Sequence, residues 1–159
     1  MRERPIIDWL LDNNCRILVP RIVEREILAG QGKYSDAKIA AERLKVNEIE
    51  VFDVSDSSSS VLSAYGLGSG EQGVMLLAFS IKSMIDYVIL DDKLAYIVSD
   101  RVLLPKLFLL DLILEMAFRD ILTADLVKEI CHSVSPRYSQ GMIEHTLLML
   151  EKGERKWLK

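Results

Sequence analysis

The sequence has 159 residues, of which 50% are hydrophobic and 28% are charged, with a net charge of −4 at pH 7. These values exclude a disordered chain and favour a single globular domain over residues 1–159. The negative charge excludes a surface that holds nucleic acid by overall positive charge, although it is compatible with a local basic patch.

Three further features predict a cytoplasmic protein without a membrane segment. Cys15 and Cys131 have neither a CxxC nor a metal-ligand spacing, which is typical of reduced, buried thiols. No signal-peptide pattern opens the sequence. The most hydrophobic stretch, Val102–Phe118, carries charged side chains and is too short to span a bilayer.

Helical and strand patterns alternate along the chain. Strands are expected at Arg16–Val19, Ile49–Val54, Tyr87–Asp91 and Val102–Leu104. Helices are expected at 6–14, 21–29, 35–44, 70–84, 93–99, 106–119, 123–132 and 139–152, with one more between the serine run 56–60 and Gly66. The alternation predicts an α/β fold, a three-layer sandwich with a mainly parallel sheet.

The chain is organised around the stretch Gly70–Asp92. Its helix is apolar after the first turn, so we expect it to be buried on most sides. Ser69 is expected to cap this helix, with Gln72 completing a capping box. The apolar strand that follows ends at Asp91 and Asp92, where open α/β sheets place their ligands.

Most of the candidate acids also have a purely structural interpretation. Glu26 is typical of a solvated helix face. Glu71 lies in a first helical turn, where the helix dipole alone favours it. Asp92 is in position to cap the helix that begins at Lys93. Asp91 is the hardest to interpret in this way, because it ends a buried strand.

Three segments of the sequence together are similar to a known family: LVPRIVEREI (18–27), GEQGVMLLAFSIKSMIDYVILDDKLA (70–95) and SQGMIEHTLLMLEK (139–152). In their order and spacing they resemble the PIN-domain family, in the prokaryotic branch with many toxin-like ribonucleases, and the resemblance covers about Ile17–Lys152. It implies a divalent-metal-dependent endoribonuclease that cleaves single-stranded RNA. It also implies a toxin of a toxin–antitoxin pair, with an antitoxin protein as its partner.

The resemblance also implies the site residues. The family's acids correspond to Glu26, Glu71 and Asp91, which would be catalytic and would bind Mg²⁺ or Mn²⁺ together with Asp92. Carboxylate oxygens are the ligands that these hard ions prefer. Such ions neutralise charge on the phosphate and make a bound water nucleophilic.

The sequence departs from the family at its first strand, which normally ends in Asp-Thr or Asp-Ser. Ile6-Ile7-Asp8-Trp9 is similar to that motif, but Val19 follows Asp8 by only eleven positions. We therefore expect Asp8 on a helix. The family's first strand is expected to lie before Met1, to be replaced by another element or subunit, or to be altered in this protein. In addition, Pro105-Lys106-Leu107 stands where the family has Gly-Thr.

Several functions remain open at this point. The first is an active PIN-type ribonuclease, and the second is a catalytically inactive PIN-like binding or assembly module. A third is an unrelated doubly wound domain that binds a small ligand at its strand ends. A homodimer is expected because a sheet without its central strand leaves unpaired backbone groups. The apolar segments Val102–Phe118 and Met142–Leu150 favour the same assembly.

Overall fold

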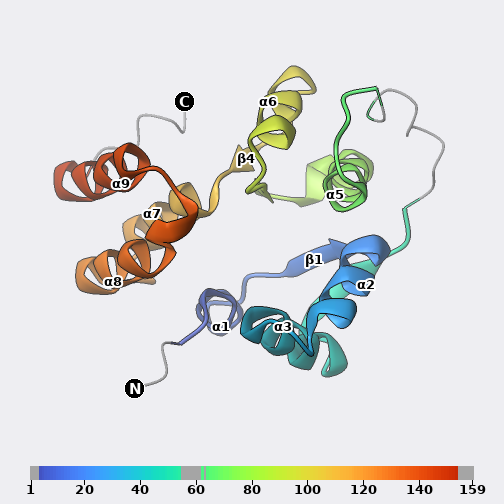
Figure 1. Ribbon diagram of the computed structural model, residues 1–159, viewed down its shortest axis with the longest axis horizontal. Coiled ribbons are helices and arrows are strands. Elements are labelled where there is room, and N and C mark those ends of the chain that lie inside the picture. The colour runs from blue at the N-terminus through green and yellow to red at the C-terminus, as the bar shows by residue number, and fades with distance from the viewer. Residues whose placement is uncertain (1–3, 55–61, 63, 154–159) are drawn as a thin grey trace. The chain divides into compact units, whose positions relative to one another are not determined.

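Helices alternate with short strands in the structure, which confirms the predicted α/β class. The computed structural model describes residues 4–54, 62 and 64–153, and the chain divides into two compact units, Met1–Lys106 and Leu107–Lys159 (Figure 1). Within these ranges, no helix has the length and apolar character needed to cross a membrane. The helix expected after the serine run 56–60 lies largely outside the described residues.

The first unit contains a parallel pair of strands, β1 (Ile17–Pro20) and β2 (Ile49–Phe52). Ile17 lies opposite Ile49, and Pro20 lies opposite Phe52. Both strands were predicted to within two residues. Pro20 has no backbone N–H and fixes its own φ, so the strand ends there and helix α2 (Arg21–Gly30) begins at the next residue.

Two helices complete this part of the unit. Helix α1 (Ile6–Asp12) precedes β1, and helix α3 (Ser35–Lys45) lies between α2 and β2 in the sequence. Helix α3 packs against α2 and β2, and α2 lies beside β1 (Figure 1). Asp8 is therefore on a helix, as predicted.

Helix α5 (Ser69–Ser80) packs against both α2 and β1. Its consecutive residues Met75–Ala78 are all buried, so the predicted burial on most sides is confirmed. The predicted end at Met84 is wrong. The Ser80 hydroxyl donates to the Leu77 carbonyl at 2.7 Å where the α-helix ends, and a 3₁₀ turn, Lys82–Met84, follows.

The predicted capping of α5 is also wrong. The residue at the N-cap is Gly68, and no side chain makes a capping hydrogen bond there. Ser69 is instead the first helical residue. The Gln72 amide donates to the Leu67 carbonyl at 2.7 Å, so it does not form the expected capping box.

A second two-stranded sheet pairs β3 (Val88–Ile89) with β4 (Lys106–Leu107), and helix α6 (Lys93–Arg101) lies between them in the sequence. The Val88 N–H donates to the Pro105 carbonyl at 2.7 Å. The described strands thus form two short sheets, whereas one continuous sheet was expected. The strands β3 and β4 hold only two residues each, so they offer few backbone groups for further pairing.

The strand predicted at Val102–Leu104 is not formed. Leu103 takes the left-handed conformation, with φ of 55°, and its N–H donates to the Asp100 carbonyl at 3.2 Å. These residues turn the chain after α6, and the strand begins only after Pro105. An apolar run thus indicated a strand where the backbone needs a turn.

The side chains of α5, β3 and α6 share one hydrophobic core. Its buried members are Leu62, Leu67, Met75, Leu76, Ala78, Val88, Leu90, Ala95, Val98 and Leu104. This core fixes the residues at the end of β3, and with them the position of Asp91 and Asp92 relative to α5.

The second unit contains helices α7 (Leu109–Phe118), α8 (Ala124–Val134) and α9 (Gln140–Lys152), each of which contacts the other two (Figure 1). The last two begin where the sequence predicts, each with a capping side chain at its N-terminus. Thr123 Oγ1 accepts from the Leu126 N–H at 3.3 Å, and Ser139 Oγ accepts from the Met142 N–H at 3.4 Å.

Candidate active site

Glu26 reaches from the exposed face of α2 to the first turn of α5. A β-carbon placed on Gly70 would lie 2.7 Å from Glu26 Oε2 and 3.1 Å from Oε1. The Ser69 hydroxyl donates to Glu26 Oε1 over a long 3.5 Å. The carboxylate therefore lies against the N-terminal end of α5, where the helix dipole favours negative charge.

Glu71 lies in that same first turn of α5, one residue beyond Gly70. Its side chain folds back over Gly68, so that a β-carbon on Gly68 would coincide closely with Glu71 Oε2. Two of the acids named from the sequence, Glu26 and Glu71, are thus both held at the head of one helix. Glu71 is half-buried, whereas Glu26 is exposed.

The other two acids follow β3. Asp91 is exposed and stands directly after the buried Leu90. Asp92 is the N-cap of α6, and its Oδ1 accepts from the Ala95 N–H at 2.8 Å. The capping role considered for Asp92 is therefore confirmed, and one of its two oxygens is already engaged.

The acids do not form a ready-made metal cluster in this structure. Among residues 4–54, 62 and 64–153, no group of three or more His, Cys, Asp or Glu side chains is arranged to hold a metal ion. That Glu26, Glu71 and Asp91 converge in one cleft thus stays a prediction. The structure brings together the first two at the head of α5.

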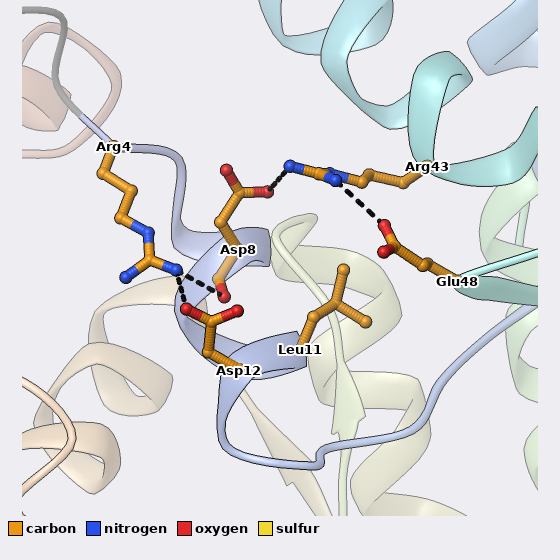
Figure 2. Close-up of a pocket in the computed structure, with 6 residues that line it drawn as sticks. All are labelled: Arg4, Asp8, Leu11, Asp12, Arg43 and Glu48. Atoms are coloured by element: carbon orange, nitrogen blue, oxygen red, sulfur yellow. Dashed lines mark hydrogen bonds and ion pairs between the residues drawn. The ribbon is translucent and has the colours of Figure 1, made fainter. Parts of the chain in front are cut away.

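Asp8, whose surroundings resemble the family's first motif, has a different partner. Arg43 Nη2 lies 2.8 Å from Asp8 Oδ1 in an ion pair that lacks hydrogen-bond alignment, and Arg43 Nη1 donates to Glu48 at 3.0 Å. Figure 2 shows the Arg43 guanidinium between these two acids, in a small polar hollow that is also lined by Arg4 and Asp12. Asp8 therefore ties α1 to the end of α3.

Arg21 at the start of α2 makes a second ion-pair cluster. Its Nε donates to Asp53 Oδ1 at 3.0 Å, and its Nη1 donates to Glu24 at 2.9 Å. The hydrogen bond from Arg21 holds the pKa of the Asp53 carboxyl below its usual value. The hydrogen bonds to Asp53 and then Glu24 raise the pKa of Arg21.

Sequence reasoning missed two features of this region. Arg21 and Asp53 are 32 positions apart, so no local pattern indicates their contact. The sequence gives Gly68 and Gly70 no role beyond the start of a helix at Gly70. Their closeness to two carboxylates depends on packing of α5 against α2, which the sequence does not show.

Comparison with known proteins gives one match. A family model described as a PIN domain matches residues 5–152, which lie in both units of the chain. No curated protein and no solved structure matches significantly. The matched range covers more than half of the sequence and contains Glu26, Glu71, Asp91 and Asp92. The alternation of helices with short parallel strands agrees with it, and the chain therefore belongs to the PIN-domain family, with that family's nuclease-type fold.

Proposed function

We propose that residues 1–159 act as a single PIN-like domain and as a divalent-metal-dependent endoribonuclease of single-stranded RNA. One observation carries the proposal: in a chain of the PIN family, the Glu26 carboxylate lies at the head of α5, whose first turn also carries Glu71. Family membership removes the alternative of an unrelated doubly wound domain that binds a small ligand.

The donor chemistry fits Mg²⁺ or Mn²⁺. Glu26, Glu71 and Asp91 offer carboxylate oxygens, the ligands that hard ions prefer, and Asp92 keeps one oxygen outside its helix cap. Gly68 and Gly70 leave the space that two of these carboxylates occupy. A bound ion would neutralise charge on the phosphate and activate a water. The third ligand, Asp91, would have to approach the other two.

The residues themselves would then have separate tasks. Glu26 and Glu71 would hold the ion at the N-terminal end of α5, whose dipole would also favour the phosphate of the RNA. Asp91 would complete the ligand set. Asp8 does not stand in place of the acid of the family's first strand, because it lies on α1 and is paired with Arg43.

We therefore expect weak or absent RNA cleavage by residues 1–159, with any activity greater in Mn²⁺ than in Mg²⁺. Each missing carboxylate lowers the affinity of the site for a weakly bound ion. Mn²⁺ binds protein ligands more readily than Mg²⁺ does. The measurement is cleavage of a labelled single-stranded RNA with each metal and with a chelator, which is expected to abolish it.

Asp91→Asn tests the site in the same assay. It is expected to abolish cleavage while leaving the circular dichroism spectrum unchanged. Asp125→Asn is the matched control, because the Asp125 side chain on α8 is 92% exposed and 4.0 Å from its nearest cation, Lys128. Equal cleavage by the parent and Asp91→Asn would refute the proposed site. Robust cleavage in Mg²⁺ would show that another acid, such as Asp8, supplies the missing ligand.

A toxin of a toxin–antitoxin pair is the biological role that we propose for such an enzyme, in the cytoplasm and with an antitoxin protein as partner. Expression of the chain in a bacterial host is then expected to arrest growth, and Asp91→Asn is expected to relieve the arrest. Growth arrest by both proteins alike would exclude RNA cleavage as its cause.

The second candidate function is a catalytically inactive PIN-like binding or assembly module. It is favoured by the pairing of Asp8 with Arg43 and by the lack of a three-acid group among the described residues. Absence of cleavage in every metal, together with retained binding of RNA or of a protein partner, would support this function over the enzyme.

A further inference from the structure

The glycines of α5 differ from the other described glycines in what a β-carbon would meet. On Gly70, the three nearest atoms would all belong to Glu26: Oε2 at 2.7 Å, Oε1 at 3.1 Å and Cδ at 3.3 Å. On Gly141, the second residue of α9 as Gly70 is the second residue of α5, a β-carbon would meet nothing within 4 Å.

Backbone conformation does not explain glycine at the head of α5. The described glycines with positive φ are Gly66 and Gly153. Gly68 has φ of −62° and ψ of 159°, values open to any residue, and Gly70 is helical. Alanine is the better helix former at such a position. Glycine at position 70 is therefore explained by the space that the Glu26 carboxylate occupies.

We propose that Gly70 is a positioning residue for Glu26, an inference that rests on the proposed function for its role in metal binding. The missing β-carbon lets the Glu26 carboxylate lie against the first turn of α5, one residue from Glu71. Gly68 makes the equivalent space for the Glu71 carboxylate, which folds back over it. The Gly68-Ser69-Gly70 segment thus holds two acids from two different helices at one place.

The obstacle at Gly70 is the far end of a flexible side chain, not backbone. A methyl group at this position would consequently move the carboxylate and leave the helix in place. Gly70→Ala is thus expected to keep the fold and to lose the geometry of the two acids. Gly141→Ala, at the same position of another helix, is the matched control.

The first measurement needs no metal. In the NMR spectrum of protein labelled with ¹³C at the glutamate carboxyl carbons, each glutamate gives one resonance. The resonance that is lost in Glu26→Gln is that of Glu26. Gly70→Ala is expected to shift this resonance, whereas Gly141→Ala is expected to leave it unchanged. An unchanged Glu26 resonance in Gly70→Ala would overturn the inference, and so would loss of its folded circular dichroism spectrum.

The second measurement is Mn²⁺ binding, followed by electron paramagnetic resonance of the free ion. Gly70→Ala is expected to weaken binding by about 10- to 100-fold, the usual effect of disturbing the groups that orient a metal ligand. In the double variant Gly70→Ala, Glu26→Asp, the acid is shorter by one methylene and is expected to regain part of the affinity.

The outcomes separate the inference from the proposed function. Equal Mn²⁺ binding by the parent and Gly70→Ala would overturn the positioning role of Gly70, but it would not contradict the proposed metal site. No Mn²⁺ binding by the parent would instead count against the proposed function, while the Glu26 resonance would still decide the positioning role.

Discussion

Asp8 and Glu26 are both carboxylates on helices of the first unit, but their surroundings give them different tasks. Asp8 is paired with Arg43 at 2.8 Å, so its charge is compensated within the protein. Glu26 lies against Gly70 and the Ser69 hydroxyl, near the first turn of a helix and another acid. We therefore interpret Asp8 as an acid that holds α1 in place, and Glu26 as the acid that is available for the proposed metal ion.

Asp8→Asn is expected to lower the free energy of unfolding by roughly 1 kcal/mol, the size typical of a partly exposed ion pair. Arg43 would lose one of its two acidic partners, while Glu48 would keep it from being left unpaired. Urea denaturation of the parent and the variant measures the difference.

Asp125→Asn serves again as the control, because substitution of an exposed acid is expected to change stability by no more than about 0.5 kcal/mol. The informative contrary result would be an Asp8→Asn protein with full stability but weakened Mn²⁺ binding. Asp8 would then be the acid that replaces the one on the family's first strand.

Helix α5 packs closely on α2 and β1 through a third glycine, Gly73. A β-carbon on Gly73 would lie 2.5 Å from Ile22 Cγ2 and 3.3 Å from Pro20 Cγ. These are atoms of a well-packed contact, unlike the flexible carboxylate that faces Gly70. Gly73 therefore sets the distance between α5 and α2, on which the reach of Glu26 also depends.

Gly73→Ala is expected to destabilise the protein. Overpacking of a core contact lowers the free energy of unfolding by roughly 1–3 kcal/mol. The better helix propensity of alanine offsets about 1 kcal/mol of this loss. Urea denaturation beside Gly141→Ala, which is expected to be neutral or stabilising, measures the net effect. A Gly73→Ala protein as stable as Gly141→Ala would show that α5 can shift away from Ile22 without loss.

Local signals in the sequence predicted the helices well and the short strands less well. Thr123 and Ser139 mark their helices because a cap needs only a side chain and the N–H three residues on. The run Val102–Leu104 reads as a strand, but Leu103 takes φ of 55° because the chain must turn between α6 and Pro105. The turn is closed by hydrogen bonds of the Leu103 and Leu104 N–H groups to α6, and an apolar run carries no signal for them.

The residues of the candidate site stay a prediction, and their arrangement could not be predicted from the sequence. The resemblance to the family indicated Glu26, Glu71 and Asp91, and the family match supports the resemblance. The role of Gly70 was not predictable, since it depends on how α2 and α5 pack. The pairing of Asp8 with Arg43 likewise joins two helices that are far apart in the sequence.

Apolar side chains remain at least partly exposed in both units of the chain. β1 is wholly apolar, yet Ile17, Leu18 and Val19 are only half-buried, and in the described part of the chain β1 pairs only with β2. In the second unit, α9 leaves Met142 and Leu148 exposed. A strand edge of this kind attracts further backbone pairing, and exposed apolar side chains favour association.

A homodimer is therefore expected, in which a second copy covers part of this surface. Light scattering coupled to size exclusion is expected to give twice the chain mass at high protein concentration, with dissociation on dilution if the buried area is small. Added salt is expected to leave the dimer intact, because the contact proposed here is apolar and its charged contribution is small. A monodisperse monomer at high concentration would contradict the dimer.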